Sequence, residues 1–385
     1  MAMGDKYFQY TQICPVSFGP GAVEEIADKV RQFGASRVAL IYDAGVAASG
    51  MADRVIKLLE DAGLVVAVFD DVKADPTDAS VEAIYDTVAK GAGSELVVGL
   101  GGGSVLDSAK MLGLLIKGSG PLRPHMLSAG MNPPLPIAPV VLLPTTSGTG
   151  SEVSCVAVVS HHEDHVKDAI FASASYVILD PELTVSAPPH VTAFAGFDAL
   201  AHSLESFTSA SADPMSKLCA FEAMRLVVEN LKAAWENGSD LEARTNLAFA
   251  SNLAGLAFNN TGLHIGHTFG HELGGTFNLP HGMAASYAIP TIIRFTAKHD
   301  PERAAEVARA FGVATAEEAA QKALDLMHAL GIKKFSENGI TVEAAQAIAE
   351  DAIAHNVFYH NTVVPVSVEE FKAIIAEIIT TYDEG

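Results

Sequence analysis

The sequence is poor in cysteine. Its 385 residues include only Cys14, Cys155 and Cys219. Three scattered cysteines are too few for a disulfide framework or a thiolate zinc site, and they indicate a reducing compartment. Each is interpreted as a small buried or half-buried hydrophobic residue.

Positive charge is also scarce. There are 24 Lys and Arg residues against 46 Asp and Glu residues, which gives a formal net charge of -22. Nucleic acid and anionic membrane surfaces are therefore poor partners, because neutralising phosphates requires clustered Lys and Arg. A small uncharged ligand suits this composition better.

Long hydrophobic runs are missing as well. The apolar runs are short and interrupted by Gly or Pro, so no membrane span is predicted. The first 21 residues have no basic flank followed by an apolar core, a pattern that is not typical of a secretory signal. We therefore expect a cytoplasmic protein.

The composition that is present is globular, with 49% hydrophobic and 18% charged residues. A chain of this length exceeds the usual size of one hydrophobic core, which predicts two domains with a cleft between them. Four β-rich runs, at 38–42, 64–69, 96–100 and 137–143, alternate with helix-like segments in the first half. This alternation predicts an α/β nucleotide-binding domain with a parallel sheet over residues 1–190.

From about residue 191 the periodicity becomes helical. Clear examples are residues 214–234, 241–258, 301–311 and 368–381. The second domain, residues 191–385, is therefore predicted to be all-helical.

A glycine-rich turn follows the third predicted strand and reads GGGSVLDSAK from Gly101 to Lys110. Glycines allow backbone N–H groups to approach a pyrophosphate, and the start of the next helix points its positive end to the same place. The spacing differs from the dinucleotide fingerprint GxGxxG. In the alternative interpretation, Ser104 and Asp107 form a capping box that only starts the helix.

A second loop of Gly, Ser and Thr follows the fourth strand, at residues 145–152. It should lie at the same carboxyl edge of the sheet, where open α/β sheets bind ligands. Helix capping by Ser or Thr is the alternative. Asp43, at the end of the first strand, could accept hydrogen bonds from an adenine ribose and repel a 2′-phosphate, which favours NAD over NADP; an ordinary turn residue is the equal alternative.

Histidines cluster in the second half. Asp198 and His202 are four residues apart, which places both on one face of a helix. Downstream, the chain has His264, His267 and His271 in one window and His281 on a predicted turn. One carboxylate and several imidazoles suit Fe²⁺ or Zn²⁺. The spacing alone does not choose among His264, His267 and His271 as the third ligand, and for a lone histidine a satisfied buried residue would be the better interpretation.

Together, GGGSVLDSAK, PTTSGTGSE, GFDALAHSLES and HTFGHELGGTFNLPHG resemble motifs of the iron-containing (group III) alcohol dehydrogenase family. The likeness runs from residue 18 to about residue 290. It implies a homodimer that binds Fe²⁺, with Zn²⁺ as an alternative, through Asp198, His202, His267 and His281. It also implies that His271 lies near the nicotinamide and the substrate as a candidate proton relay, and it leaves His264 as a structural or cleft-lining residue.

The resemblance further implies a set of cofactor contacts: Asp43, Asp75, Gly102, Gly103, Ser104, Asp107, Thr145, Thr146, Thr149, Lys167 and Leu183. The assignment of Asp75 and Lys167 as cofactor contacts rests on the resemblance alone. From the sequence pattern, Asp75 would be a turn residue and Lys167 a surface cation. The chain departs from the family at residues 360–365, where an Asn-Pro-Arg-like segment is usual, and at Ala174, where a proline is expected. The first departure leaves the identity of the substrate open.

The predicted activity is reversible hydride transfer between NAD(P) and a small primary alcohol or aldehyde, with the metal as Lewis acid. A dehydroquinate-synthase-like lyase is one alternative, but it would need Lys and Arg for an anionic substrate and the metal motifs contain neither. Another is a transhydrogenase that never releases its nucleotide. A metal-stabilised structural or filament protein is the non-enzyme alternative, which the loss of a ligand would favour; none is missing.

Overall fold

The computed structural model of the chain describes residues 7–130, 135–163, 166–355 and 358–384. These residues form two compact units. The sheet unit contains Ile13–Pro188 and Gly238–Ala248, and the helical unit contains Pro189–Asn237, the described residues from Phe249 onward and those up to Gln12. The predicted domain boundary after residue 190 stays a prediction.

The sheet unit is built on a parallel sheet of six strands in the order β1-β8-β5-β4-β2-β3, which confirms the predicted fold class. The strands are β1 (Val16–Phe18), β2 (Arg37–Tyr42), β3 (Val65–Phe69), β4 (Leu96–Gly101), β5 (Val140–Pro144) and β8 (Tyr176–Leu179). β6 (Val156–Ser160) and β7 (Lys167–Phe171) form a separate antiparallel hairpin. β4 and β5 are buried along their whole length, which explains their continuous apolar sequence.

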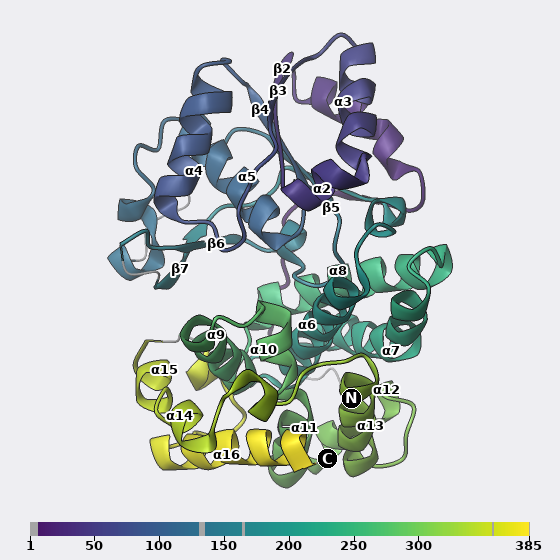
Figure 1. Cartoon of the computed structure of the whole chain (residues 1–385), viewed down its shortest axis with the longest axis vertical. Helices are drawn as coiled ribbons and strands as arrows, with labels where there is room; N and C mark the ends of the chain where they lie inside the picture. Colours follow the sequence, from purple (N-terminus) through teal and green to yellow (C-terminus); the bar gives the residue numbers. More distant parts are fainter. Residues whose placement is uncertain (1–6, 131–134, 164–165, 356–357, 385) are drawn as a thin grey trace. The chain divides into compact units, whose positions relative to one another are not determined.

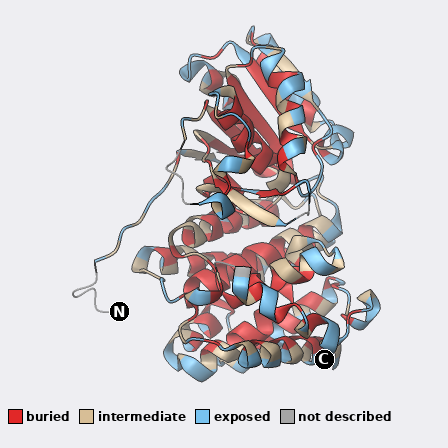
Figure 2. Ribbon diagram, turned by 90° about the vertical axis from the view of Figure 1, so that its left-hand side faces the viewer, coloured by how far each residue is buried: buried red, intermediate tan, exposed pale blue. Residues whose placement is uncertain are grey.

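Helices cover both faces of this sheet. Figure 1 shows α3 and α5 on opposite sides of the strands, and Figure 2 shows the strands as the buried layer. The helical segments are η1 (Ala22–Glu25), α1 (Ile26–Gln32), α2 (Ala44–Ser49), α3 (Met51–Asp61), α4 (Asp78–Ile84), η2 (Tyr85–Lys90), α5 (Gly103–Ile116), η3 (Arg123–His125), η4 (Leu127–Ala129), η5 (Ser151–Val153) and η6 (Pro181–Thr184). Apolar residues of α1 and α3 pack with those of β2 and β4 in one core.

The start of α5 corrects one prediction. Its N-cap is Gly102, with extended backbone angles and no side-chain cap, so the capping box of Ser104 and Asp107 is wrong. Ser104 already lies inside the helix. Asp107 instead accepts a hydrogen bond from Ser151 Oγ at 2.6 Å, so its carboxylate joins α5 to the loop after β5.

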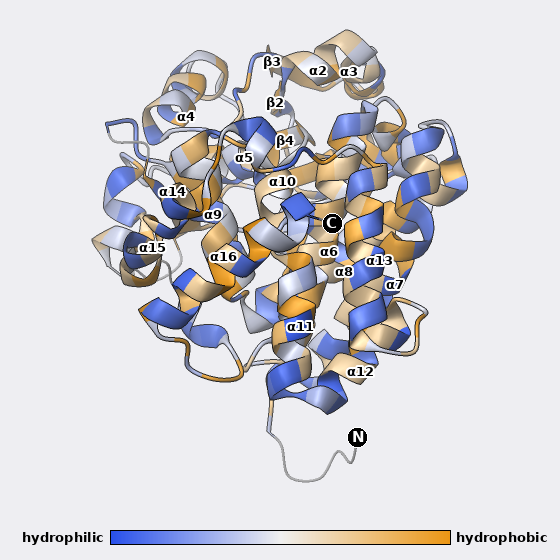
Figure 3. Ribbon diagram, turned by 60° about the horizontal axis from the view of Figure 1, so that its bottom comes forward, coloured by the Kyte–Doolittle hydropathy of each residue, from blue (hydrophilic) through white to orange (hydrophobic). Residues whose placement is uncertain are grey.

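The described residues of the helical unit form helices and loops without a strand. The helices are α6 (Pro189–Thr208), α7 (Pro214–Glu236), the end of α8 (Leu241–Thr261), α9 (Ile265–Phe277), α10 (His281–Ser286), α11 (Ile289–His299), α12 (Pro301–Ala310), α13 (Ala316–Ala329), η7 (Ser336–Asn338), α14 (Val342–Gln346), α15 (Ala349–His355), η8 (Tyr359–Asn361) and α16 (Val368–Glu384). The bands of hydrophilic and hydrophobic residues along α13 in Figure 3 are typical of a helix on a surface. In contrast, α6 is buried throughout residues 196–208.

The helices named above belong to the described parts of the chain. None of their helices combines the length and the apolar character that crossing a bilayer requires.

Lys110 is a fully buried cation in the sheet unit. Its Nζ donates to Ser151 Oγ at 2.9 Å, to Ser154 Oγ at 3.1 Å and to the carbonyl of Val156 at 2.7 Å. It also lies 3.3 Å from Asp107 Oδ1. Because a buried charge is stable only with partners, this lysine ties α5 to η5 and β6.

We expect Lys110→Met to lower the free energy of unfolding by about 3 kcal/mol, because Asp107 loses its buried cation. Lys117→Met, at the exposed end of the same helix, is the matched control and should change stability by no more than about 0.5 kcal/mol. Urea denaturation followed by circular dichroism measures both. Equal effects of the two substitutions would contradict a specific role for Lys110.

Candidate active site

Three ionisable side chains lie on one face of α6. Asp198, His202 and Glu205 are spaced four and three residues apart, so they follow each other along the helix. Their exposed fractions are 2%, 5% and 2%. Side chains of this kind must find partners on neighbouring helices, since water does not reach them.

Two further helices supply imidazoles. His267 lies in the first turn of α9 and is completely buried, and His271 lies one turn later and is half-buried. His281 is the first residue of α10, directly after Pro280. The prediction of a turn at His281 is therefore wrong, because this residue already begins the helix.

Four of these side chains converge. Asp198, His202, His267 and His281 each offer one ligand atom, and the four atoms lie within 4.8 Å of one another. Asp198 Oδ1 is 3.3 Å from His281 Nε2, 3.8 Å from His267 Nε2 and 3.9 Å from His202 Nε2. One carboxylate oxygen thus faces three imidazole nitrogens.

The electrostatics of this cluster are strongly coupled. Burial raises the pKa of the Asp198 carboxyl, but the charges of His202 and His281 outweigh it and hold that pKa well below its usual range. Burial lowers the pKa of His267, but Glu205 and Asp198 outweigh it and raise the pKa to about 9. Near neutral pH the cluster therefore holds an ionised carboxylate and, on His267, a proton that a cation can replace.

The cluster fits a divalent metal ion. Asp198 Oδ1 and His267 Nε2 are buried and have no hydrogen-bond partner among the described residues. Orphaned buried atoms of opposite character are rare in folded proteins. One carboxylate and three imidazoles are donors that Fe²⁺ and Zn²⁺ both accept.

The other two histidines of the second window have different surroundings. His264 is the N-cap of α9, and its Nε2 lies 2.8 Å from Thr208 Oγ1, away from Asp198. The ring of His271 lies 5.1 Å from that of His281 and 5.7 Å from that of Phe358, measured between centroids. Of the three candidates for a third ligand, the structure brings His267 to Asp198.

Sequence reasoning missed Glu205. Its Oε1 accepts a hydrogen bond from His267 Nδ1 at 2.6 Å. Glu205 therefore contacts the ring nitrogen of His267 that does not face Asp198. A usable signal was present, because Glu205 continues the face of α6 that carries Asp198 and His202.

In the sheet unit, the residues predicted to bind the cofactor follow the carboxyl ends of adjacent strands. By strand, they are Leu183 after β8; Thr145, Thr146 and Thr149 after β5; Gly102, Gly103, Ser104 and Asp107 after β4; Asp43 after β2; and Asp75 after β3. Lys167 is the exception, because it begins β7 in the separate hairpin. An edge of this kind is where open α/β sheets bind ligands.

The two glycine-rich loops touch. The N–H of Thr145 donates to the carbonyl of Gly101 at 3.0 Å. A Cβ added to Gly103 would lie 2.8 Å from Thr149 Cγ2, so only glycine permits this approach. The loops after β4 and β5 therefore form one surface.

The two residues that rested on resemblance alone lie together. Lys167 Nζ is 2.9 Å from Asp75 Oδ1, and the N–H of Asp75 donates to Ser104 Oγ at 3.3 Å. Asp43 accepts a hydrogen bond from the N–H of Val46 and is the N-cap of α2, a role that neither sequence interpretation had given it. The side chain of Leu183 lies in the hydrophobic core.

Family models match both halves of the chain. The one described as "Iron-containing alcohol dehydrogenase" matches residues 15–181, and the one described as "Fe-containing alcohol dehydrogenase family, C-terminal" matches residues 192–379.

Individual proteins agree with these matches. The chain is 34% identical over 375 residues to alcohol dehydrogenase 4 of Saccharomyces cerevisiae, covering 94% of this chain and 96% of the yeast protein. It is 35% identical over 347 residues to the NAD-dependent methanol dehydrogenase of Bacillus methanolicus, covering 87% and 90%. The crystal structure of sulfoacetaldehyde reductase from Bifidobacterium kashiwanohense in complex with NAD+ superposes with a TM-score of 0.90 at 28% identity, covering 98% of this chain and 100% of that one.

Fold and relatives together define an oxidoreductase that acts on alcohols. The chain belongs to the iron-containing alcohol dehydrogenase family.

We expect Zn²⁺ to stabilise the metal-free protein and so to raise its melting temperature. At a Zn²⁺ concentration a hundred times the dissociation constant, the free energy of unfolding should rise by about 2.7 kcal/mol. The protonated form of His267 stabilises the metal-free fold below its pKa of about 9 and is lost as the pH rises through that value, whereas a metal needs the deprotonated form. The rise in melting temperature on adding Zn²⁺ should therefore be larger at about pH 8.5 than at about pH 6.5. Scanning fluorimetry measures it.

Mg²⁺ is the control for this experiment, since it prefers oxygen ligands and should give little shift. A shift with Mg²⁺ equal to that with Zn²⁺, or a Zn²⁺ shift that survives Asp198→Ala, would contradict a site made of these four side chains.

Proposed function

We propose that this protein is a divalent-metal-dependent, NAD-linked alcohol dehydrogenase and aldehyde reductase for small primary alcohols. The observation that carries the proposal is the pair of orphaned buried atoms, Asp198 Oδ1 and His267 Nε2, at the centre of a carboxylate and three imidazoles. Relatives named for methanol and 1,3-propanediol support a short alcohol. The scattered cysteines favour the cytoplasm, and the family likeness favours a homodimer.

The proposed metal ligands are Asp198, His202, His267 and His281, with Fe²⁺ as the expected ion and Zn²⁺ as the alternative. Both ions accept these donors, and cellular supply often decides between them. Held by these four side chains, a divalent cation would supply Lewis-acid chemistry, and a nicotinamide nucleotide would supply hydride chemistry.

The nucleotide is proposed to bind along the carboxyl edge of the sheet. Backbone N–H groups of Gly102 and Gly103 at the start of α5 suit the pyrophosphate, because a helix N-terminus favours anions. Asp43, Asp75, Ser104, Asp107, Thr145, Thr146, Thr149, Lys167 and Leu183 complete the proposed set. Asp43 is an acid directly after β2, so its carboxylate can accept hydrogen bonds from the ribose hydroxyl groups and repel a 2′-phosphate. Both effects favour NAD.

The chain's own side chains would divide the remaining work. His271 is proposed to exchange the hydroxyl proton of the alcohol at a ring nitrogen, as the half-buried imidazole beside His281. Phe258 lies 4.7 Å from the ring of His202, and Phe358 contacts His271. These aromatic rings cover part of the two imidazoles.

The test of this function is anaerobic reconstitution of metal-free protein with Fe²⁺ and, separately, with Zn²⁺. NADH consumption is then followed by absorbance across a panel of short aldehydes. Metal-dependent consumption is the expected result. No consumption with either metal, despite measured NAD binding, would favour the lyase or transhydrogenase alternatives.

His267→Ala and His271→Ala should separate metal binding from proton transfer. His267→Ala should remove metal and activity together. His271→Ala should keep the metal and lower kcat by about a hundredfold, the usual contribution of a positioned acid or base. Metal analysis and steady-state kinetics measure both; full turnover in His271→Ala would contradict the relay.

Asp43→Asn tests the preference for NAD. Asparagine can still cap α2, so the change removes the charge and keeps the helix start. We expect kcat/KM for NADP relative to NAD to rise about tenfold, because less repulsion opposes the 2′-phosphate. Asp70→Asn, just after the edge strand β3, is the control; an equal change there would point to net charge and not to Asp43.

A further inference from the structure

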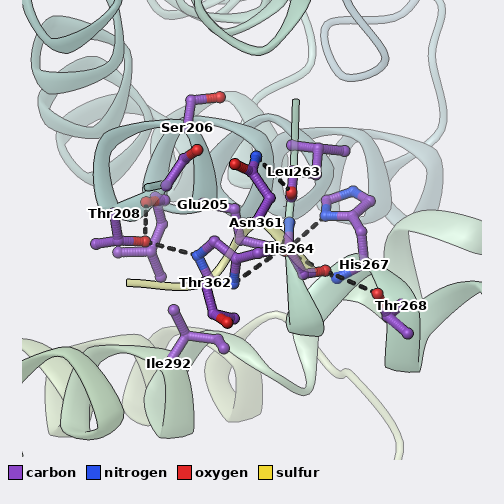
Figure 4. Close-up of polar contacts among 12 residues, drawn as sticks. Glu205, Ser206, Thr208, Leu263, His264, His267, Thr268, Ile292, Asn361 and Thr362 are labelled. Carbon is purple, nitrogen blue, oxygen red and sulfur yellow. Dashed lines mark hydrogen bonds and ion pairs between the residues drawn. The ribbon is translucent and has the colours of Figure 1, made fainter. Parts of the chain in front are cut away.

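Glu205 is an acidic side chain inside the helical unit, with 2% of its surface exposed. Its Oε1 accepts from His267 Nδ1 at 2.6 Å, and its Oε2 accepts from the backbone N–H of His264 at 2.8 Å and of His267 at 3.2 Å. Figure 4 shows Glu205 and His264 within the polar cluster that precedes α9. Three N–H donors thus compensate one buried carboxylate.

The contact with Nδ1 determines the protonation pattern of His267. An ionised carboxylate only accepts hydrogen bonds, so Nδ1 must carry the proton. His267 Nε2 is then the nitrogen that faces Asp198 Oδ1, at 3.8 Å. Glu205 therefore selects both the ring orientation and the nitrogen available to a cation.

The same carboxylate holds the start of α9. The first N–H groups of a helix lack partners within the helix, and the N-cap residue His264 provides no side-chain cap. Glu205 reaches from α6 and takes two of these N–H groups. Because a carboxylate also interacts favourably with the positive end of a helix, it sets the position of the backbone that carries His267.

Gly266 makes this contact sterically possible. A Cβ added at Gly266 would lie 2.5 Å from Glu205 Oε1. Gly275, in the same helix, has nothing within 4 Å of an added Cβ. The same substitution by alanine would therefore displace Glu205 at Gly266 but meet no atom at Gly275, so Gly275 serves as the control.

The loop before α9 is held from the other side as well. Thr208 Oγ1 lies 2.8 Å from His264 Nε2, and Asn361 Nδ2 donates to the carbonyls of Thr261 at 2.6 Å and Leu263 at 3.0 Å. Asn361 lies in the segment that departs from the family pattern. These contacts restrain the loop but do not reach the Nδ1 of His267, which leaves that task to Glu205.

We propose that Glu205 is a positioning residue of the metal centre, which presents His267 Nε2 to the cation and supplies the second of two negative charges that balance a divalent ion. The inference rests on the proposed metal site. Carboxylates behind a metal-bound histidine typically change metal affinity by about 10- to 100-fold.

The experiment measures Zn²⁺ affinity of the full chain by competition with a chromophoric chelator, and the visible spectrum of bound Co²⁺ at saturation. Glu205→Gln should weaken Zn²⁺ binding by about 10- to 100-fold and shift the Co²⁺ bands, because His267 is reoriented. Gly266→Ala should weaken binding in the same direction, whereas Gly275→Ala should bind as the wild type does.

Wild-type affinity and an unchanged Co²⁺ spectrum in Glu205→Gln would overturn the proposal. If that variant fails to fold by circular dichroism, Gly266→Ala decides: binding equal to that of Gly275→Ala overturns the proposal, and selective weakening supports it. His267→Ala separates the two levels of inference. If it binds Zn²⁺ as the wild type does, the metal site itself is wrong; if it loses Zn²⁺ while both Glu205→Gln and Gly266→Ala keep it, only the role of Glu205 is wrong.

Discussion

The buried charge of Asp198 is the constraint on which the helical unit depends. An ionised carboxylate with almost no exposure is costly unless cations or donors surround it. Three imidazoles from α6, α9 and α10 provide that surrounding, so these helices must present His202, His267 and His281 to one point. Attraction to Asp198 thereby brings residues of three helices together in the buried interior of this unit.

Charge is arranged differently in the sheet unit. The fully buried Lys110 follows the glycine-rich turn on α5, and it contacts Asp107 on the same helix and Ser151 in η5, after β5. The loops after β4 and β5 are consequently held by an ion pair and hydrogen bonds beneath them.

The sequence predicted elements best where a strong period or an apolar run decided the structure. The helix expected at 214–234 is α7, Pro214–Glu236, and the runs at 38–42 and 96–100 are β2 and β4. The strands β1 and β8, of three and four residues, were not predicted, because so few residues do not establish a pattern. The capping box at Ser104 failed for a related reason: its spacing was right, but Gly102 had already begun the helix.

The choice among three histidines illustrates what local spacing omits. His264, His267 and His271 are three and four residues apart and would share one face if a single helix contained them all. The helix begins at Ile265, so the backbone of His264 is not helical and its ring turns to Thr208. What places that start is Glu205 on another helix, 59 residues from His264 in sequence. The period of a helix thus identifies a face, whereas the tertiary contact at its first turn determines which side chain on that face meets Asp198.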